Sequence, residues 1–412
     1  MAELYGIDYL QRKLSAKQAR VRLRYSYYDM KHKEFDFGIS TPPALRNWMS
    51  TLGWCAKSVD CLADRLQFDG FKDDNFELET IYNMNNPDTL FDSAILSALI
   101  SACSFIYITE DESGYPRMQV LDGARATGII DPFTGLLSEG YAVIEEDGMH
   151  AAKKVAYLTP GKTEVYRYGG EMNNKRTLLD VAAYDCDYPL LVPIIYRPDA
   201  ARPFGHSRIS RACMSLVGSA VRTMKRSEIA AEFYSFPQKY ATGLSEDAEQ
   251  MDKWRATMSS LLVFTKDEDG EVPTLGQFSQ QSMAPHTEQL KMFASLFAGE
   301  TGLTLDDMGF TTDNPSSAEA IKASHETLRL MARKAQRNFG SGFLNAGYLA
   351  ACVRDKTAYK RSAVYLSRPQ WLPIFEPDAS TMSLIGDGAI KLNQAVPDYI
   401  NKERLHALTG ID

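Results

Sequence analysis

The sequence predicts an α+β protein whose mixed body carries a helical stalk, and three observations support this. In the first hundred residues, apolar side chains recur at three-to-four spacing, as in amphipathic helices. Residues 104–196 then show strand patterns separated by Gly and Asp-Gly turns. Two long helical stretches, near 207–235 and 285–302, finally flank a small insert.

The body should contain helices followed by an antiparallel meander. Consecutive strands joined by short turns pair with their neighbours in antiparallel order. The expected helices are 3–32, 44–66, 75–84 and 88–103. The expected strands are 104–109, 117–121, 126–130, 141–145, 154–158, 164–168 and 190–196.

The stalk is predicted from a helix, an insert and a returning helix. An apolar stripe runs from Ile209 to Ala231, and Phe236-Pro237 ends the first helix, while 286–302 forms the second. One copy would bury such a stalk poorly, whereas copies packed side by side in a ring would cover it. The insert should contain a strand at 238–241, a helix at 248–258, a strand at 261–265 and a turn at 267–270.

A second long helix is expected after a short polar loop. The loop is 310–315, and the helix begins at the capping box Ser316-Ser317-Ala318-Glu319, in which Ser and Glu side chains satisfy first-turn amides. Neither a metal ligand nor a nucleophile–base pair accompanies the loop. The pattern is typical of a place that grips or guides a partner.

Composition limits the classes of function. The chain has 412 residues, enough for two to four domains, with a net charge of −8 and a pI near 5.4. Proteins that hold nucleic acid tightly are usually basic, so such a role is disfavoured, although a pore through which DNA slides is compatible. The N-terminus has no signal-peptide pattern, and the most apolar stretch, 94–108, is too short to cross a bilayer.

The chain shows no pattern for a catalytic or metal centre, so neither enzyme activity nor a cofactor is expected. Six scattered cysteines contain no CxxC pair, which predicts free, mostly buried thiols in a reducing cytosol. The six histidines are far apart and are expected to be surface or capping residues. Asp267-Glu268-Asp269-Gly270 lacks the spacing of a calcium loop and is expected to form a hairpin turn.

Three segments resemble the portal proteins of tailed phages, most closely the family of siphophages with Gram-positive hosts. The first is the turn Arg202-Pro203-Phe204-Gly205-His206-Ser207-Arg208-Ile209, which leads into a long helix. The second is the helix, loop and helix of 297–339. The third runs from Trp371-Leu372-Pro373 to Asp387-Gly388-Ala389-Ile390-Lys391-Leu392. Their order and spacing make the combination specific, and together they run through most of residues 195–412.

The resemblance implies a portal-like fold with an α/β wing, long stem helices, a small α/β clip and a helical crown. It also implies a dodecameric ring at the capsid vertex of the virion, assembled in the host cytoplasm. Double-stranded DNA would pass through the ring. The ring would dock the terminase large subunit and later a head-completion (adaptor) protein. The major capsid and scaffold proteins would be further partners. The implied divisions are wing 1–206, stem helix 207–235, clip 236–284, second stem helix 285–308, tunnel loop 309–316, long helix and return to the wing 317–377, and crown 378–412.

Three groups of residues are candidates for function. Those of the tunnel loop would touch DNA weakly through short polar groups, and those of the stem would set the register between subunits by complementary charge. The tunnel-loop candidates are Thr311, Thr312, Asp313, Asn314 and Pro315. The stem candidates, on the outer face of the first stem helix, are Arg208, Arg211, Arg222, Lys225 and Arg226. The clip candidates for terminase or adaptor contact are Trp254, Gln277, Gln280 and Gln281.

Alternatives remain open from the residues alone. The loop could be an ordinary capped connection between helices, and Trp254 could be a core residue of the insert. The basic residues Lys322, Arg329, Arg333, Lys334 and Arg337 could pair with Glu319 and Glu326 of their own helix, pair between subunits or contact DNA phosphates. The chain could also be an enzyme acting on nucleic acid or cell wall with a site in 104–196, or a ring-forming scaffold unrelated to DNA.

Overall fold

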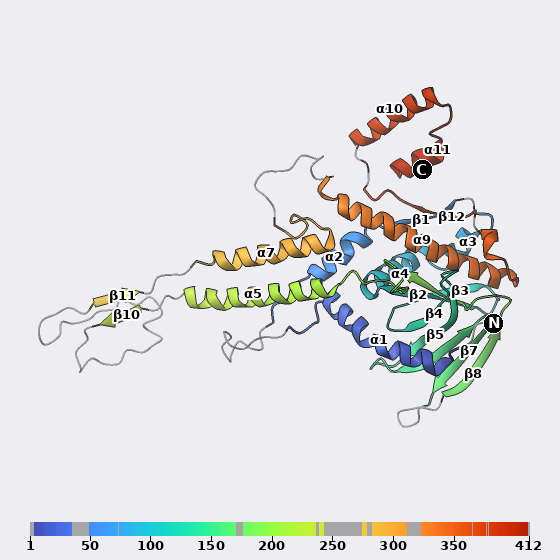
Figure 1. Ribbon diagram of the computed structural model, residues 1–412, viewed down its shortest axis with the longest axis horizontal. Coiled ribbons are helices and arrows are strands. Elements are labelled where there is room, and N and C mark those ends of the chain that lie inside the picture. The colour runs from blue at the N-terminus through green and yellow to red at the C-terminus, as the bar shows by residue number, and fades with distance from the viewer. Residues whose placement is uncertain are drawn as a thin grey trace, which may run out of the picture.

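Two antiparallel sheets and the surrounding helices form the body, and a pair of long helices projects from it (Figure 1). The structure is a computed structural model, and the predicted α+β class is confirmed. The described residues are 4–34, 49–72, 74–169, 176–235, 239–242, 274–277, 282–310, 323–364, 366–375, 377 and 379–410.

The larger sheet is a meander of five antiparallel strands that pair in chain order. Its strands are β4 (Ala126–Ile130), β5 (Leu137–Glu146), β6 (Ala152–Thr159), β7 (Lys162–Tyr168) and β8 (Arg176–Ala183). The predicted meander is confirmed from β4 to β7. The sequence pattern does not predict β8, an edge strand whose side chains are mostly exposed and therefore do not alternate.

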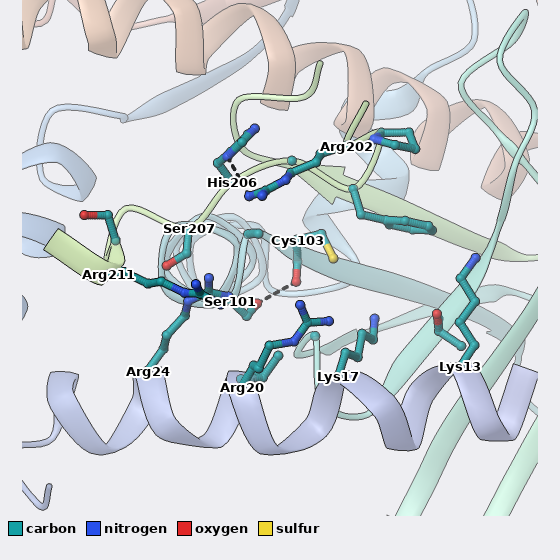
Figure 2. Close-up of a pocket in the computed structure, with 18 of the residues that line it drawn as sticks. Lys13, Lys17, Arg20, Arg24, Ser101, Cys103, Arg202, His206, Ser207 and Arg211 are labelled. Carbon is teal, nitrogen blue, oxygen red and sulfur yellow. Dashed lines mark hydrogen bonds between the residues drawn. The ribbon is translucent and has the colours of Figure 1, made fainter. Parts of the chain in front are cut away.

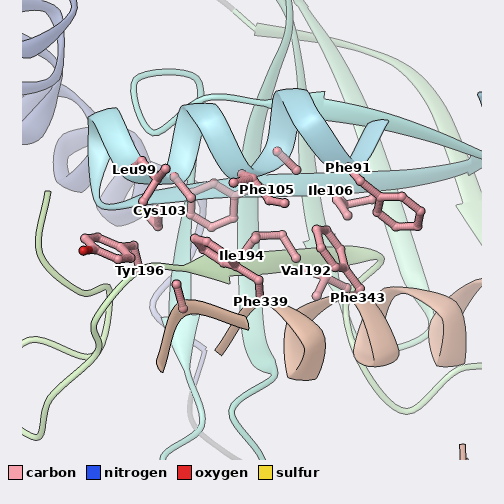
Figure 3. Packing of buried hydrophobic residues seen from close by; sticks show 14 of the residues in the cluster. Phe91, Leu99, Cys103, Phe105, Ile106, Val192, Ile194, Tyr196, Phe339 and Phe343 are labelled. Carbon is pink, nitrogen blue, oxygen red and sulfur yellow. The ribbon is translucent and has the colours of Figure 1, made fainter. Parts of the chain in front are cut away.

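A three-stranded antiparallel sheet lies at the centre of the body. β2 (Cys103–Glu110) pairs with β3 (Pro116–Leu121) on one side and β9 (Leu191–Ile195) on the other. α4 (Pro87–Ser101) covers one face of this sheet and α9 (Glu326–Asp355) the other (Figure 3). Because both faces are covered, β2 carries a continuous apolar run, and Phe105 and Ile106 are both fully buried.

A small sheet joins segments that lie far apart in the sequence. β1 (Phe68–Lys72) pairs antiparallel with β12 (Arg368–Trp371). The Phe68 ring centroid lies 4.5 Å from that of Phe91, 5.2 Å from that of Phe343 and 5.0 Å from that of Trp371. The sheet is fastened to the core by these aromatic contacts, which no local pattern predicts.

The first helix lies across the larger sheet. α1 (Ile7–Tyr28) buries Leu10 and Leu14 in a small cluster with residues of β5 and β6. Just before the helix, the backbone amides of Tyr5 and Gly6 donate to the buried Glu139 carboxylate, at 2.9 and 2.7 Å. The chain is thus fixed to β5 immediately ahead of α1.

The projecting pair is α5 (Arg211–Ser235) and α7 (Ala284–Thr301), which confirms two predicted helices. The first begins at Arg211, later than the predicted 207, because residues 207–210 belong to the preceding turn. Beyond the pair, β10 (Lys239–Thr242) confirms the strand predicted at 238–241 and pairs with β11 (Thr274–Gln277), which was not expected. The helix, strand and turn predicted within 248–270 lie outside the described residues.

Other helices differ from the predicted limits. The helix predicted at 44–66 is shorter, since α2 (Trp54–Ala63) follows Gly53, residues 49–53 are not helical and 44–48 lie outside the described residues. α3 (Leu78–Asn83) corresponds to 75–84, and a 3₁₀ turn (Arg361–Val364) follows α9. α10 (Ala379–Ala395) and α11 (Lys402–Thr409) form the C-terminal pair.

Cysteine chemistry follows the prediction. All six cysteines are free thiols, and five of them are buried.

In the part of the chain that the structure describes, no helix is both long and apolar enough to cross a bilayer. Across those same residues, no group of three His, Cys, Asp or Glu side chains could hold a metal ion.

Candidate functional site: the stem junction and a basic groove

The turn before α5 depends on a glycine. Gly205 has a φ of +76°, and a Cβ atom there would lie 2.1 Å from the carbonyl oxygen of Tyr196. Only glycine fits that conformation and that approach. The next amide, of His206, donates to the same Tyr196 oxygen at 3.0 Å. The turn is therefore held against the end of β9.

The same turn also binds the end of α4. The Ser207 hydroxyl donates to the Ile100 carbonyl at 2.6 Å, and the Arg208 amide donates to the Leu99 carbonyl at 2.9 Å. The last carbonyls of a helix have no partner within the helix, so these bonds satisfy them. The beginning of the stem is thus fixed to the core sheet and to α4.

Arg208 does not lie on the outer face of the stem, and that prediction is wrong. It is 6% exposed, and its guanidinium donates to the Ser58 carbonyl of α2 and, at 2.9 Å, to the Thr301 carbonyl of α7. A further nitrogen lies 3.6 Å from the Met331 sulfur of α9. A buried charge requires such partners, and here it joins three helices inside one chain.

The two stem helices run antiparallel. The Ser210 hydroxyl, just before α5, donates to Glu300 at 3.0 Å, and farther out the Thr223 hydroxyl donates to Gln289 at 3.0 Å. Phe297 is fully buried at the base of the pair, 5.6 Å from the Trp54 ring of α2. The contacts are concentrated near the body.

The outer side of α7 remains open in one chain. Met292 and Leu296, one helical turn apart, are 49% and 54% exposed. Of the remaining stem candidates, Arg211 and Arg226 are exposed and Lys225 is half-buried, while Arg222 lies 3.5 Å from Glu34 of its own chain. Their role between subunits stays a prediction.

The segment that precedes the predicted tunnel loop is anchored to the start of α9. The backbone amide and hydroxyl of Thr304 donate to the Asp307 carboxylate, both at 2.9 Å, and the His325 ring lies 3.3 Å from it. Burial works to raise the pKa of Asp307, but these hydrogen bonds and the His325 charge outweigh it and lower the pKa. His325 immediately precedes α9, so both ends of the loop region are held together.

Several predicted site residues cannot be placed. Gln277 ends β11, and nothing is described of its side chain. Arg329 forms a two-bond ion pair with Glu326 of its own helix, at 2.6 Å for both bonds, which agrees with the pairing alternative. The candidates outside the described residues are Thr311, Thr312, Asp313, Asn314, Pro315, Trp254, Gln280 and Gln281, together with Lys322 and the capping box 316–319.

A groove rich in positive charge lies where α1 faces the turn (Figure 2). Its volume is about 750 Å³, and its floor includes Ser101 and Cys103 at the junction of α4 and β2. We call it the basic groove. Its cationic side chains are Lys13, Lys17, Arg20 and Arg24 from α1, Arg202 from the turn and Arg211 from α5, and its one lining carboxylate is Glu300.

Two lysines close the inner part of the basic groove. The Lys13 ammonium donates to the Gly128 carbonyl and that of Lys17 to the Ala126 carbonyl, each at 2.8 Å. The Lys17 nitrogen also lies 5.1 Å from the Phe105 ring centroid. Burial lowers the pKa of both lysines, and their mutual repulsion lowers the pKa of Lys13 further.

Three arginines of the basic groove have no partner among the described residues. Arg20, Arg24 and Arg211 form no ion pair or hydrogen bond with the described residues. Burial lowers the pKa of Arg24, and the charges of Arg20, Arg202 and Arg211 add to this effect. Sequence reasoning missed the groove, because its residues come from three distant segments. The signal present was the Lys/Arg spacing of 13, 17, 20 and 24 on one helix face.

Comparisons with known proteins show what the chain is similar to. No family model matches the chain. It is 24% identical over 349 residues to the portal protein of Mycobacterium phage L5, covering 79% of this chain and 69% of that protein. It is likewise 24% identical over 354 residues to the portal protein of Mycobacterium phage D29, covering 80% and 70%.

Two solved structures are also similar, both from the neck of a gene transfer agent particle. The neck of the native particle, computed with C12 symmetry, is 14% identical, with 95% of this chain and 99% of that chain covered and a TM-score of 0.48. The neck of the empty particle, computed with C6 symmetry, is 13% identical, with 92% of this chain and 96% of that chain covered and the same TM-score. The resemblance to portal proteins that the sequence predicts is confirmed by the two mycobacteriophage proteins, to which the chain is similar over most of its length.

Proposed function

We propose that this chain is the subunit of a portal ring at the capsid vertex, through which DNA enters and leaves the virion. The observation that carries the proposal is the match to two proteins named portal protein, which extends over most of both chains. The enzyme alternative has less support, since both relatives are named portal protein, which implies a structural role.

The open side of the stem fits this function. Met292 and Leu296 expose apolar surface that a neighbouring stem would cover. Complete burial of such a side chain from water stabilises by about 1.5–3 kcal/mol, and about half of that remains to be gained here. A ring of twelve copies would repeat this contact and enclose a channel. The chain would supply the channel, and the terminase would supply the energy for packaging.

The parts beyond the described residues take their proposed roles from the sequence. The strands β10 and β11 of the insert follow the far end of the stem pair (Figure 1). The insert 236–284 would contact terminase and then the adaptor protein, with Trp254, Gln277, Gln280 and Gln281 as candidates. Residues 311–315 would line the narrowest part of the channel. Short polar side chains and the negative charge of Asp313 would let DNA slide without deep energy wells.

The ring is tested by electron microscopy of the purified protein together with light scattering. We expect perforated rings with a turbine outline and a mass near twelve subunits. A protein that stays monomeric at all concentrations and salts would contradict the proposal. A compact monomer that turns over a nucleic-acid or cell-wall substrate would favour the enzyme alternative.

The channel role of the loop is tested with charge and size. Asp313→Lys or Thr312→Trp should leave rings intact and reduce the DNA packaged per capsid. Asp306→Lys is the matched control, because Asp306 is exposed and lies just before the loop. If the loop variants package a full genome, the loop is only a capped connection between helices.

A further inference from the structure

Among the described residues, the basic groove holds more positive than negative charge. Outside its lining, the half-buried Asp122 also acts on Lys17 by its charge. Six cationic side chains line it, against the single carboxylate Glu300, which already accepts a hydrogen bond from Ser210. Arg24 is half-buried and has no partner among the described residues, although placing a guanidinium away from water is unfavourable without one. In a chain of net charge −8, such a concentration of positive charge points to an acidic group from another molecule.

A patch of the opposite sign lies at the other end of α4. Asp60 lies on α2, Asp64 follows the end of α2, and Asp88 and Asp92 lie on the first half of α4. We call these four residues the acidic patch. Asp64, Asp88 and Asp92 are exposed and form no ion pair with the described residues. Asp88 and Asp92 lie one helical turn apart on α4, and α2, which ends just before Asp64, packs against α4. Burial raises the pKa of Asp92, and the charges of Asp88 and Asp64 raise it further.

The acidic patch is not explained by helix capping alone. A carboxylate in the first turn of a helix is stabilised by the helix dipole, which accounts for Asp88. It does not account for Asp64, which belongs to another segment, or for Asp92, which lies beyond the first turn. Three mutually repelling carboxylates without a cation are unfavourable in one copy and become favourable beside arginines of a second.

The two charged regions are separated by the length of α4. This helix has 15 residues and is therefore about 22 Å long, with Asp88 in its first turn and Ser101, on the floor of the basic groove, as its last residue. A head-to-tail contact, which closes into a ring, joins different surfaces of two identical subunits. Complementary charges at opposite ends of one rigid element suit such a contact.

We infer that the basic groove of one subunit binds the acidic patch of the next subunit in the ring. Carboxylates on a helix end can enter a cavity of about 750 Å³ and meet arginines in paired hydrogen bonds. A DNA duplex is a stiff convex rod, so its phosphates would reach the rim of the cavity and not the inner lysines. The inference rests on the proposed ring and concerns how its subunits choose their neighbours.

The test is a charge swap between two variants of the full-length chain. Variant one carries Arg20→Glu and Arg211→Glu, both at exposed positions of the basic groove. Variant two carries Asp88→Lys and Asp92→Lys in the acidic patch. Each variant alone weakens the attraction at every contact, because variant one leaves four cations beside two new carboxylates and variant two replaces two of the four patch carboxylates by lysines. Each should raise the concentration for half-assembly at least about tenfold. In an equal mixture, subunits that alternate make opposite-charge contacts throughout, and rings should form again.

Controls separate this effect from misfolding and from a change in total charge. Arg12→Glu with Arg22→Glu reverses two exposed charges on the same helix outside the basic groove and should assemble as the wild type does. Circular dichroism and thermal unfolding of each variant report folding. Arg20→Gln with Arg211→Gln is a milder version that should weaken assembly in the same direction.

The outcomes are distinct. Weakened single variants and a restored mixture support the inference. If both variants form rings as readily as the wild type, the inference is overturned and the portal function stands. The same conclusion follows if variant one assembles weakly and mixing it with variant two does not restore rings. Normal rings with lost binding of a short DNA duplex in variant one would assign the groove to DNA instead. A wild-type chain that never forms rings removes the proposed function and this inference together.

Discussion

Helices α4 and α7 are similar in length but differ in how much of their surface one chain covers. α4 has 15 residues, of which eight are buried against β2, α1 and α2. α7 has 18 residues, and only Ala294, Phe297, Ala298 and Thr301 are buried. Most helical stability in proteins comes from packing of an apolar face. The body therefore completes its packing within one chain, whereas the outer side of α7 stays open there.

The largest test of this difference uses adjacent residues of α7. Phe297→Ala should cost about 3–5 kcal/mol of unfolding free energy in the monomer, because the side chain is fully buried beside Trp54. Leu296→Ala, at a 54% exposed position, should change monomer stability by less than about 0.5 kcal/mol. Denaturant unfolding measures both.

The same pair sharpens the comparison in the assembled state. If stems pack side by side, Leu296→Ala should weaken ring assembly while Phe297→Ala mainly unfolds the base of the stem. Equal losses of monomer stability would show that both sides of α7 are packed within one chain.

Two glycines offer a second test. Gly205→Ala should cost about 2–4 kcal/mol, since a Cβ atom would meet the Tyr196 carbonyl at 2.1 Å and φ is +76°. Gly299→Ala on α7 meets nothing within 4 Å and should stabilise by up to about 1 kcal/mol through helix propensity. Thermal unfolding measures the expected loss of stability in Gly205→Ala and the expected gain in Gly299→Ala. If Gly205→Ala does not lower stability, the turn rearranges freely.

A smaller effect is expected between the two stem helices. Thr223→Val removes the 3.0 Å hydrogen bond to Gln289 and should cost about 1 kcal/mol. Ser215→Ala, at an exposed position of the same helix, should be nearly neutral. Equal values for the two variants in denaturant unfolding would indicate that the outer stem pair is held together by other contacts.

The smallest effect concerns an exposed turn of the body, between β2 and β3. Hydrogen bonds from Ser113 and Tyr115 lower the pKa of Asp111 to about 2. The contribution of this carboxylate to stability is present above its unfolded pKa, near 3.8, and is lost as pH falls through about 2. NMR titration of the carboxyl carbon should give that midpoint. A midpoint near 3.8 would mean that the turn is open in solution.

Local patterns predicted much of this fold. β4 was located from its alternation and flanking turns, and the stem helices from apolar spacing and the Pro237 stop. The resemblance to portal proteins depended on three segments together, and one of them is the turn around Gly205, whose positive φ requires glycine.

The rest depended on contacts between distant segments. β1 and β12 are stabilised by each other and by the Phe68 cluster, which no window of sequence contains. Arg208 follows the spacing of an exposed helical face, yet the carbonyls of Ser58 and Thr301 surround it in the folded chain. The basic groove likewise combines α1, the turn and α5, so its charge became apparent only in three dimensions.

The attachment of the turn at Gly205 has a mechanical consequence. α5 has 25 residues and is about 37 Å long, so a sideways force at its tip acts on the turn through a long lever arm. The turn is tied by backbone and hydroxyl hydrogen bonds to Tyr196, Ile100 and Leu99 and cannot swivel freely. Torque on the stem should therefore tilt the central sheet and α4 as one piece, carrying a load at the tip to the opposite side of the subunit.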